Sequence, residues 1–153
     1  MITVQEINRL AAMRHWIDPL LESHYDELCT DKKLVLNPDW DRYVTMQKAN
    51  NLVMVAAFDD DRPGFGNCVG YTFCFLSPHI HYKDTLVAWN DVLFLHKDYR
   101  TGSAGSRLMK ATALACAQRG VKKLLWHAKP GTALDTIMTK RRPLFEKVYA
   151  QDL

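Results

Sequence analysis

The sequence predicts an α/β fold in which a mixed β-sheet is covered by helices on both faces. Stretches with apolar residues at helical spacing alternate with short, continuous apolar runs that are typical of buried strands. The predicted order is β-α-α-β-β-β-α-β-α-β, in which a meander of strands precedes a crossover helix and a further strand. The 153 residues, 48% of them hydrophobic, suffice for the core of one domain spanning residues 1–153.

Composition and charge exclude several classes of protein. The apolar fraction is too high for a disordered chain, and no apolar run reaches the ~18 residues of a membrane-spanning helix. The net charge of +3 permits an anionic ligand, but no dense basic stripe with aromatic residues indicates nucleic acid. No signal peptide is apparent, and the four cysteines lack metal-binding spacing. We therefore expect a cytoplasmic protein with reduced thiols, no resident metal and no membrane partner.

The N-terminal third predicts one strand and two helices. Residues Ile2 to Ile7 alternate weakly, as in a strand. Apolar spacing predicts a helix over Leu10 to Cys29, which Pro19 kinks or splits. The run Asn37-Pro38-Asp39 predicts the start of a second helix, with Pro38 at its first position and its end near Asn50.

The middle of the chain predicts three strands joined by turns. The strands are expected over Leu52 to Phe58, Cys68 to Leu76 and Leu86 to Leu95. A turn-rich hairpin connection over Asp59 to Asn67 separates the first two strands. A loop over Ser77 to Asp84 is expected to separate the second strand from the third.

The C-terminal third predicts two helices and two strands in alternation. These are a helix over Thr101 to Arg119, a strand over Leu124 to Ala128, a short helix from Thr132 or Asp135 to Arg141, and a last strand over Leu144 to Tyr149. Gly120 is suited to end the first of these helices in a left-handed conformation. Pro130-Gly131 turns the chain, and Pro143 ends the short helix.

The segment after Leu95 has the composition of an anion-binding loop. Gly102 and Gly105 allow backbone N–H groups to turn toward a ligand, and no bulky side chain interrupts residues 101–106. The first turn of the following helix adds unpaired N–H groups and a positive dipole end, and Arg100 adds charge at the rim. The Walker A and dinucleotide glycine patterns both fail here. We expect a phosphate or diphosphate at this loop.

At these residues the chain resembles the GNAT superfamily of N-acetyltransferases, whose signature is V-x-P-x-Y-R-G-x-G-x-G/A. Tyr99-Arg100 and Gly105 match it, Leu95 and Lys97 stand at the Val and Pro, Ser103 replaces the middle Gly, and Gly102 lies one position earlier. The predicted order of elements also follows the family, apart from a missing last strand. The chain is similar in this respect to short, phage-type members, and the resemblance implies the GNAT acyl-CoA N-acyltransferase fold.

The resemblance implies acetyl-CoA (CoA) as the co-substrate. The diphosphate would rest on the loop and helix start, and the pantetheine arm would pair with the backbone of the preceding strand. The residues so assigned are Leu93, Phe94, Leu95, Arg100, Thr101, Gly102, Ser103, Ala104, Gly105 and Ser106. That strand would splay from the strand over Leu124 to Ala128, and a backbone N–H in the slot would meet the acetyl carbonyl.

The resemblance also suggests which groups move protons. Asp91 stands where several members carry an acid that serves as general base, and His127 is the alternative base. Many members protonate the leaving thiolate with a tyrosine, at a position that matches Met138 here. No tyrosine lies within residues 132–142, so this step would use water, Tyr149 or no acid at all.

Together these observations predict an acetyl-CoA-dependent N-acetyltransferase. It would move an acetyl group to a primary amine of a protein or small molecule by direct attack in a ternary complex. A second hypothesis is a catalytically weak or inactive GNAT-fold protein that binds CoA or a partner protein, which Ser103 and Met138 favour. A third is a homodimer in which another chain completes the sheet edge at Leu144 to Tyr149. The sequence leaves the amine acceptor open.

Overall fold

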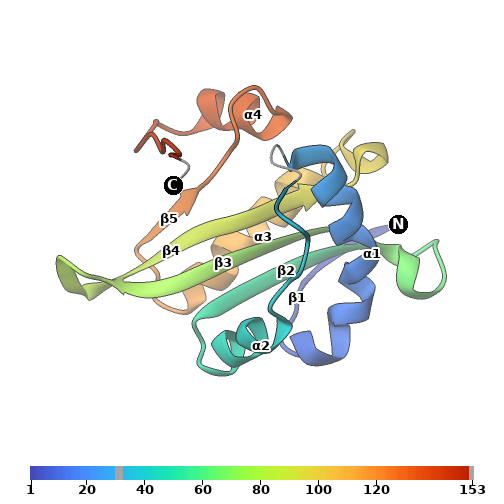
Figure 1. The fold of residues 1–153 in the computed structure, drawn as a ribbon, viewed down its shortest axis with the longest axis horizontal. Coiled ribbons are helices and arrows are strands. Elements are labelled where there is room, and N and C mark those ends of the chain that lie inside the picture. The colour runs from blue at the N-terminus through green and yellow to red at the C-terminus, as the bar shows by residue number, and fades with distance from the viewer. Residues whose placement is uncertain (30–32, 152–153) are drawn as a thin grey trace.

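The computed structural model describes residues 1–29 and 33–151 and has a mixed β-sheet at its centre (Figure 1). Its strands are β1 (Ile2–Glu6), β2 (Leu52–Asp59), β3 (Cys68–His79), β4 (Tyr82–Leu95) and β5 (Lys123–Trp126). Within the described residues they form one sheet in the order β1-β2-β3-β4-β5. The first four are antiparallel, and β5 runs parallel to β4. The predicted fold class is therefore confirmed.

Helices cover both faces of this sheet. They are α1 (Leu10–Leu28), α2 (Trp40–Lys48), α3 (Ala104–Gln118) and α4 (Ala133–Arg141), with short 3₁₀ turns η1 (Gly64–Asn67) and η2 (Lys97–Tyr99). α1 and α2 lie on one face and α3 on the other, while α4 follows β5 near the C-terminus (Figure 1). Among the described helices, none combines the length and apolarity needed to cross a membrane.

The continuous apolar run of β2 reflects its burial on both faces. Met54 and Ala56 belong to the core beneath α1 and α2, whereas Val53 and Val55 belong to the core beneath α3. All four are fully buried. Because neither face of β2 meets solvent, its sequence shows no polar alternation.

Two helix boundaries differ from those predicted. α1 continues through Pro19, so the predicted split does not occur, because Ile17 and Leu20 anchor the helix in the core on both sides of the proline. α2 begins at Trp40, and Pro38 lies outside it rather than at its first position. The carboxylate of Asp39 accepts a hydrogen bond from the Arg42 N–H at 3.0 Å, so the aspartate caps the helix.

The predicted loop over residues 77–84 is instead mostly strand. β3 continues to His79 and β4 begins at Tyr82, and these two residues are paired in the ladder. Ser77 and Pro78 are exposed, because this end of the hairpin extends beyond the helices. At this end of the hairpin, both faces of the strands tolerate polar residues. The sequence there therefore lacks the apolar residues from which a strand is predicted.

The predicted last strand, Leu144 to Tyr149, is wrong, since these residues form no ladder with any described strand. Their apolar side chains are largely exposed, with Tyr149 at 84%. The ring of Phe145 lies 4.3 Å from the Lys123 ammonium, which is a side-chain contact rather than backbone pairing. The sheet edge therefore lies at β5, and the homodimer hypothesis loses the strand on which it was built.

Candidate active site

The gap between β4 and β5 is the first feature of the site. The two strands pair from Val87 opposite Lys123 to Asn90 opposite Trp126, and the pairing ends there. β4 continues to Leu95, so its residues 91–95 have no strand on the β5 side within the described structure. Backbone groups that are unpaired at a sheet edge are available to a ligand. β5 itself ends at Trp126, so pairing stops at the place where the sequence predicts a splay.

A β-bulge lies where the strands separate. Asn90 pairs with Cys74 and Val92 with Phe73, which leaves Asp91 as the extra residue of β4. The amide of the fully buried Asn90 side chain donates to the carbonyls of Phe73, at 3.2 Å, and Val92, at 2.8 Å. It also donates to the Thr72 hydroxyl at 2.8 Å. Asn90 therefore bridges the two strands across the bulge.

Replacing Asn90 by Ala is expected to destabilise the protein by about 2 kcal/mol, because the acceptors that share the two N–H groups of this amide lose their donors. The loss is limited because the Asn90 Oδ1 is itself buried without a partner in the described structure. Urea denaturation would measure it. Thr72→Val removes a single acceptor and serves as control, with an expected loss of about 1 kcal/mol. An unchanged midpoint for Asn90→Ala would contradict this role.

The bulge places Asp91 beside the gap. The residue is exposed, and its side chain makes no hydrogen bond with any described residue. Partial desolvation by the surrounding protein raises the pKa of its carboxyl, and the electrostatic interaction with His127 opposes that rise. The Asp91 carboxylate also contributes to the raised pKa of Tyr43 of α2, after desolvation of that phenol. A carboxylate with a raised pKa and no fixed partner is suited to accept a proton.

The bend before α3 presents unused backbone donors. Gly102 has φ +84°, and a side chain there would meet nothing within 4 Å. Ser103 is the N-cap of α3, and its side chain makes no capping hydrogen bond. In the described part of the chain, no amide of residues 101–106 donates to a protein acceptor. The bend is therefore open, and its N–H groups are free for an anion.

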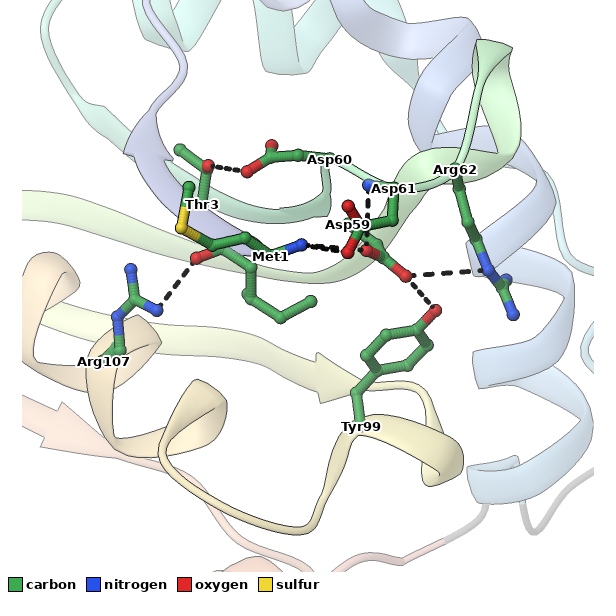
Figure 2. Close-up of polar contacts among 9 residues, drawn as sticks. Met1, Thr3, Asp59, Asp60, Asp61, Arg62, Tyr99 and Arg107 are labelled. Carbon is green, nitrogen blue, oxygen red and sulfur yellow. Dashed lines mark hydrogen bonds and ion pairs between the residues drawn. The ribbon is translucent and has the colours of Figure 1, made fainter.

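Contacts with the start of β1 and the end of β2 hold this bend in place (Figure 2). The Tyr99 hydroxyl donates to the Asp59 carboxylate at 2.7 Å, and the Arg62 guanidinium lies 5.4 Å from the Tyr99 ring. The Arg107 side chain donates to the Ile2 carbonyl at 2.9 Å. The amino group of Met1 pairs with the carboxylates of Asp59 and Asp61. The start of β1 and the end of β2, which pair with each other, thus position the bend.

The Tyr99–Asp59 hydrogen bond predicts a pH dependence of stability. It lowers the pKa of the Asp59 carboxyl, with help from the Asp61 N–H, the Met1 amino group and Arg62. Because the folded pKa is depressed, the contribution is complete above the ordinary carboxyl value of about 3.9 and is lost as the pH falls through the lowered pKa. Tyr99→Phe should therefore make the acid limb of the unfolding free energy shallower, as measured by urea titrations at several pH values. An identical acid limb would contradict this.

Arg100 lies at the rim of the bend, where the sequence analysis placed it, but its side chain is engaged. Its Nε donates to the Leu95 carbonyl at 2.8 Å, and its Nη2 pairs with the Glu27 carboxylate at 2.7 Å. The guanidinium also lies 5.6 Å from the Phe94 ring. Arg100 thus ties the end of β4 to α1, and Glu27 balances its charge.

Of the remaining predicted groups, only His127 acts electrostatically on Asp91 among the described residues. His127 is exposed and follows β5. Tyr149 lies in the exposed C-terminal segment, which does not form the strand expected to carry it. Met138 of α4 is buried, so the position of the family's tyrosine carries an enclosed apolar side chain. In the described chain, no three His, Cys, Asp or Glu side chains gather as metal ligands would.

The sequence analysis missed His24, which lies on the sheet-facing side of α1. Its ring stacks on Phe94, with centroids 4.7 Å apart and planes at 19°. Its Nδ1 lies 2.6 Å from the Tyr71 hydroxyl. The available signal was its spacing, since His24 falls four residues after Leu20 and seven after Ile17 on the buried stripe of the helix.

The arrangement combines three functions at one end of the sheet. Free amides at a helix N-terminus can bind a diphosphate, an unpaired strand edge can bind an amide-containing arm, and a carboxylate at the bulge can accept a proton. They lie consecutively along β4 and the bend, from Asp91 to Ser106.

Comparison with known proteins agrees with this geometry. The sequence profile of the "Acetyltransferase (GNAT) family" matches residues 10–135. A search of the curated proteins found no match.

Several solved structures share the fold. An aminoglycoside acetyltransferase from an uncultured soil metagenomic sample, in complex with sisomicin, aligns with a TM-score of 0.73 at 17% identity, over 99% of this chain and 95% of that chain. A ribosomal-protein-alanine N-acetyltransferase from Brucella melitensis biovar Abortus 2308 aligns with a TM-score of 0.71 at 18% identity, over 100% and 99% of the two chains. The aminoglycoside acetyltransferase AAC(6')-Iy, in complex with a bisubstrate analog, aligns with a TM-score of 0.66 at 13% identity, over 100% and 98%. At these identities the structures show the shared fold, and the profile match, which covers most of the sequence, shows that this chain belongs to the acetyltransferase (GNAT) family.

Proposed function

We propose that this protein is an acetyl-CoA-dependent N-acetyltransferase that acetylates a primary amine by direct attack in a ternary complex. The observation that carries the proposal is the row of free amides over residues 101–106, next to the unpaired edge of β4. Family membership supports it. So does the solved complex of AAC(6')-Iy with the bisubstrate analog CoA-S-monomethyl-acetylneamine, which is similar in fold.

The residues present fit acetyl-CoA. The free amides of Thr101 to Ser106 and the N-terminus of α3 suit its diphosphate, and Gly102 leaves the approach clear. The backbone of Leu93 to Leu95 has no strand partner on the β5 side, and apart from the Leu95 carbonyl, which accepts from Arg100, it is available to the amides of the pantetheine arm. Arg100 would act chiefly by holding the end of β4, because Glu27 already pairs with its guanidinium.

Acetyl-CoA supplies an activated acyl group, and the protein supplies position and proton transfer. The Asp91 carboxylate accepts the proton that the acceptor amine loses as its C–N bond forms and the C–S bond breaks. His127 is the alternative acceptor of that proton. Water protonates the departing thiolate, since Met138 has no acidic proton and Tyr149 lies in the exposed tail. Three of the four thiols, those of Cys68, Cys74 and Cys116, are buried and that of Cys29 is half-buried, which favours direct attack over an acyl-enzyme.

Calorimetry with acetyl-CoA and CoA, followed by assays of CoA release, tests the proposal. We expect binding at micromolar to sub-millimolar concentration, and CoA release above the hydrolysis background with at least one amine. Absence of acetyl-CoA binding at millimolar concentration would overturn it.

The amine panel follows from the variety of acceptors in the similar structures. The names of those proteins include an aminoglycoside, a ribosomal-protein alanine and glucosamine-6-phosphate. The panel should therefore contain an aminoglycoside, peptides with a free N-terminal alanine or a lysine, and an amino sugar phosphate. A cytoplasmic location and a relation to short phage-type members stay predictions from the sequence.

The second candidate is a GNAT-fold protein that binds CoA, or a partner protein, without turnover. The burial of Met138, where family members carry an acid, favours it. It predicts calorimetric binding of CoA and acetyl-CoA with no CoA release across the whole panel. Release of CoA with any amine of the panel would exclude it.

A further inference from the structure

His24 is held in one orientation by two neighbours on the sheet. Its ring stacks on Phe94 of β4 at 4.7 Å, and its Nδ1 meets the Tyr71 hydroxyl of β3 at 2.6 Å. Phe94 is 2% exposed and Tyr71 is fully buried, so both neighbours are fixed by core packing. These two contacts with buried residues therefore fix the position of the imidazole ring.

The Tyr71 hydroxyl determines which nitrogen of His24 carries the proton. Burial raises the pKa of Tyr71, so the phenol keeps its proton. A buried O–H needs an acceptor, and among the described residues the Tyr71 hydroxyl bonds only to His24 Nδ1. Nδ1 must then accept, which leaves the proton on Nε2. Burial also lowers the pKa of His24 to about 4, with Glu27 opposing and Lys129 assisting, so the ring is neutral near pH 7.

The last turn of α1 carries His24 to the gap between β4 and β5. Glu27 pairs with Arg100, which follows β4, at 2.7 Å. The Leu28 carbonyl accepts a hydrogen bond from Lys129, which follows β5. The turn thus touches the segments beyond both strands, and His24 stacks on the unpaired part of β4. No hydrogen bond joins its Nε2 to any residue of 1–29 or 33–151.

We propose that the Nε2–H of His24 donates a hydrogen bond to a carbonyl oxygen of the acyl-pantetheine arm, so that His24 is a binding residue of this site. A neutral donor suits a neutral carbonyl, either the thioester carbonyl or an amide carbonyl of the arm. The inference rests on the proposed function, because it requires acetyl-CoA in the gap. Tyr71 is a positioning residue, because its hydroxyl donates to Nδ1 and so keeps His24 in the Nε2–H form.

The tautomer can be measured without any ligand. Two-dimensional ¹H–¹⁵N spectra of the labelled full chain at neutral pH should show His24 as the Nε2–H form. In Tyr71→Phe the Nδ1–H form should gain population, because Nδ1 no longer accepts from the phenol. A predominant Nδ1–H form in the wild-type protein would overturn the inference.

Two substitutions separate the two edges of the ring. His24→Asn keeps an acceptor near Nδ1 for Tyr71 and removes the Nε2 donor, whereas His24→Gln places an amide donor near Nε2. We expect His24→Asn to weaken ligand binding about three- to tenfold and His24→Gln to restore part of the loss. His15→Gln, on an exposed position of the same helix, is the control and should bind as wild type does.

The choice of ligand distinguishes the two carbonyls. If His24 contacts an amide of the arm, calorimetry will show equal losses for CoA and acetyl-CoA. If it contacts the thioester, CoA binding will be unchanged and acetyl-CoA will bind more weakly. Wild-type affinity of His24→Asn for both ligands would overturn the inference. Failure of the wild-type protein to bind either ligand would instead refute the proposed function, and the spectra would still report the tautomer.

Discussion

Replacing Asp91 by Asn is expected to lower kcat/KM for the acceptor amine by about a hundredfold or more, the size of effect that a general base contributes. Asp91 is the bulged residue at the point where β4 and β5 separate, and its carboxylate makes no hydrogen bond that would give it a structural role in the described chain. The fold and CoA affinity should therefore be preserved. Steady-state kinetics, thermal unfolding and calorimetry on the same preparation would measure the three quantities.

The pH profile identifies the base. Because desolvation raises the pKa of Asp91, wild-type kcat/KM should rise with pH through that raised value, as the carboxylate becomes available. Asp91→Asn should abolish this limb. The deprotonation of the amine substrate itself produces a second limb at higher pH, which all variants share. If the lower limb persists in Asp91→Asn and vanishes in His127→Asn, the base is His127 and the assignment to Asp91 is wrong.

Replacing Ser103 by Asp should raise stability and weaken CoA binding at the same time. Ser103 is the N-cap of α3 and makes no side-chain capping bond, so an aspartate there would accept from a free amide and favour the helix dipole, by about 0.5–1 kcal/mol. The same carboxylate would occupy that amide and repel a diphosphate. We expect affinity for CoA to fall at least tenfold, a change of about 1.4 kcal/mol.

The opposite signs make this test specific. Ser103→Gly, which restores the glycine of the family signature, is the matched control and should bind CoA at least as well as the wild type. Thermal unfolding reports the first effect and calorimetry the second. Unchanged CoA affinity in Ser103→Asp would show that the diphosphate does not use this bend, and the proposed function would lose its main support.

Much of the fold could be predicted because its signals are local. The apolar runs of β2 and β4, the stripe of α1 and the ends of α3 depend on residues within one or two turns of each other. Gly120 has φ +81°, as expected for a glycine that ends a helix. Leu144 to Tyr149 shows the limit of such reasoning, because strand-like composition provides no partner for the backbone.

The candidate site likewise has one part that neighbouring residues predict and one part that depends on strand pairing. The small residues at positions 101–106 were enough to predict the open bend, because the backbone of consecutive residues forms an anion-binding loop. The position of Asp91 in a bulge depends instead on its register against Phe73 and Cys74 of another strand. The sequence by itself therefore determined the family and the open bend, because both are expressed by neighbouring residues.

The tertiary structure alone decided which side chains of α1 meet the sheet and the segment after β4. Arg100 pairs with Glu27, 73 residues away along the chain, and His24 Nδ1 meets the hydroxyl of Tyr71, 47 residues away. Neither pairing leaves a local pattern, because each depends on how α1 packs across the sheet. Hydrogen bonds and ion pairs act over a few ångströms in space, so only folding could show that these partners are neighbours.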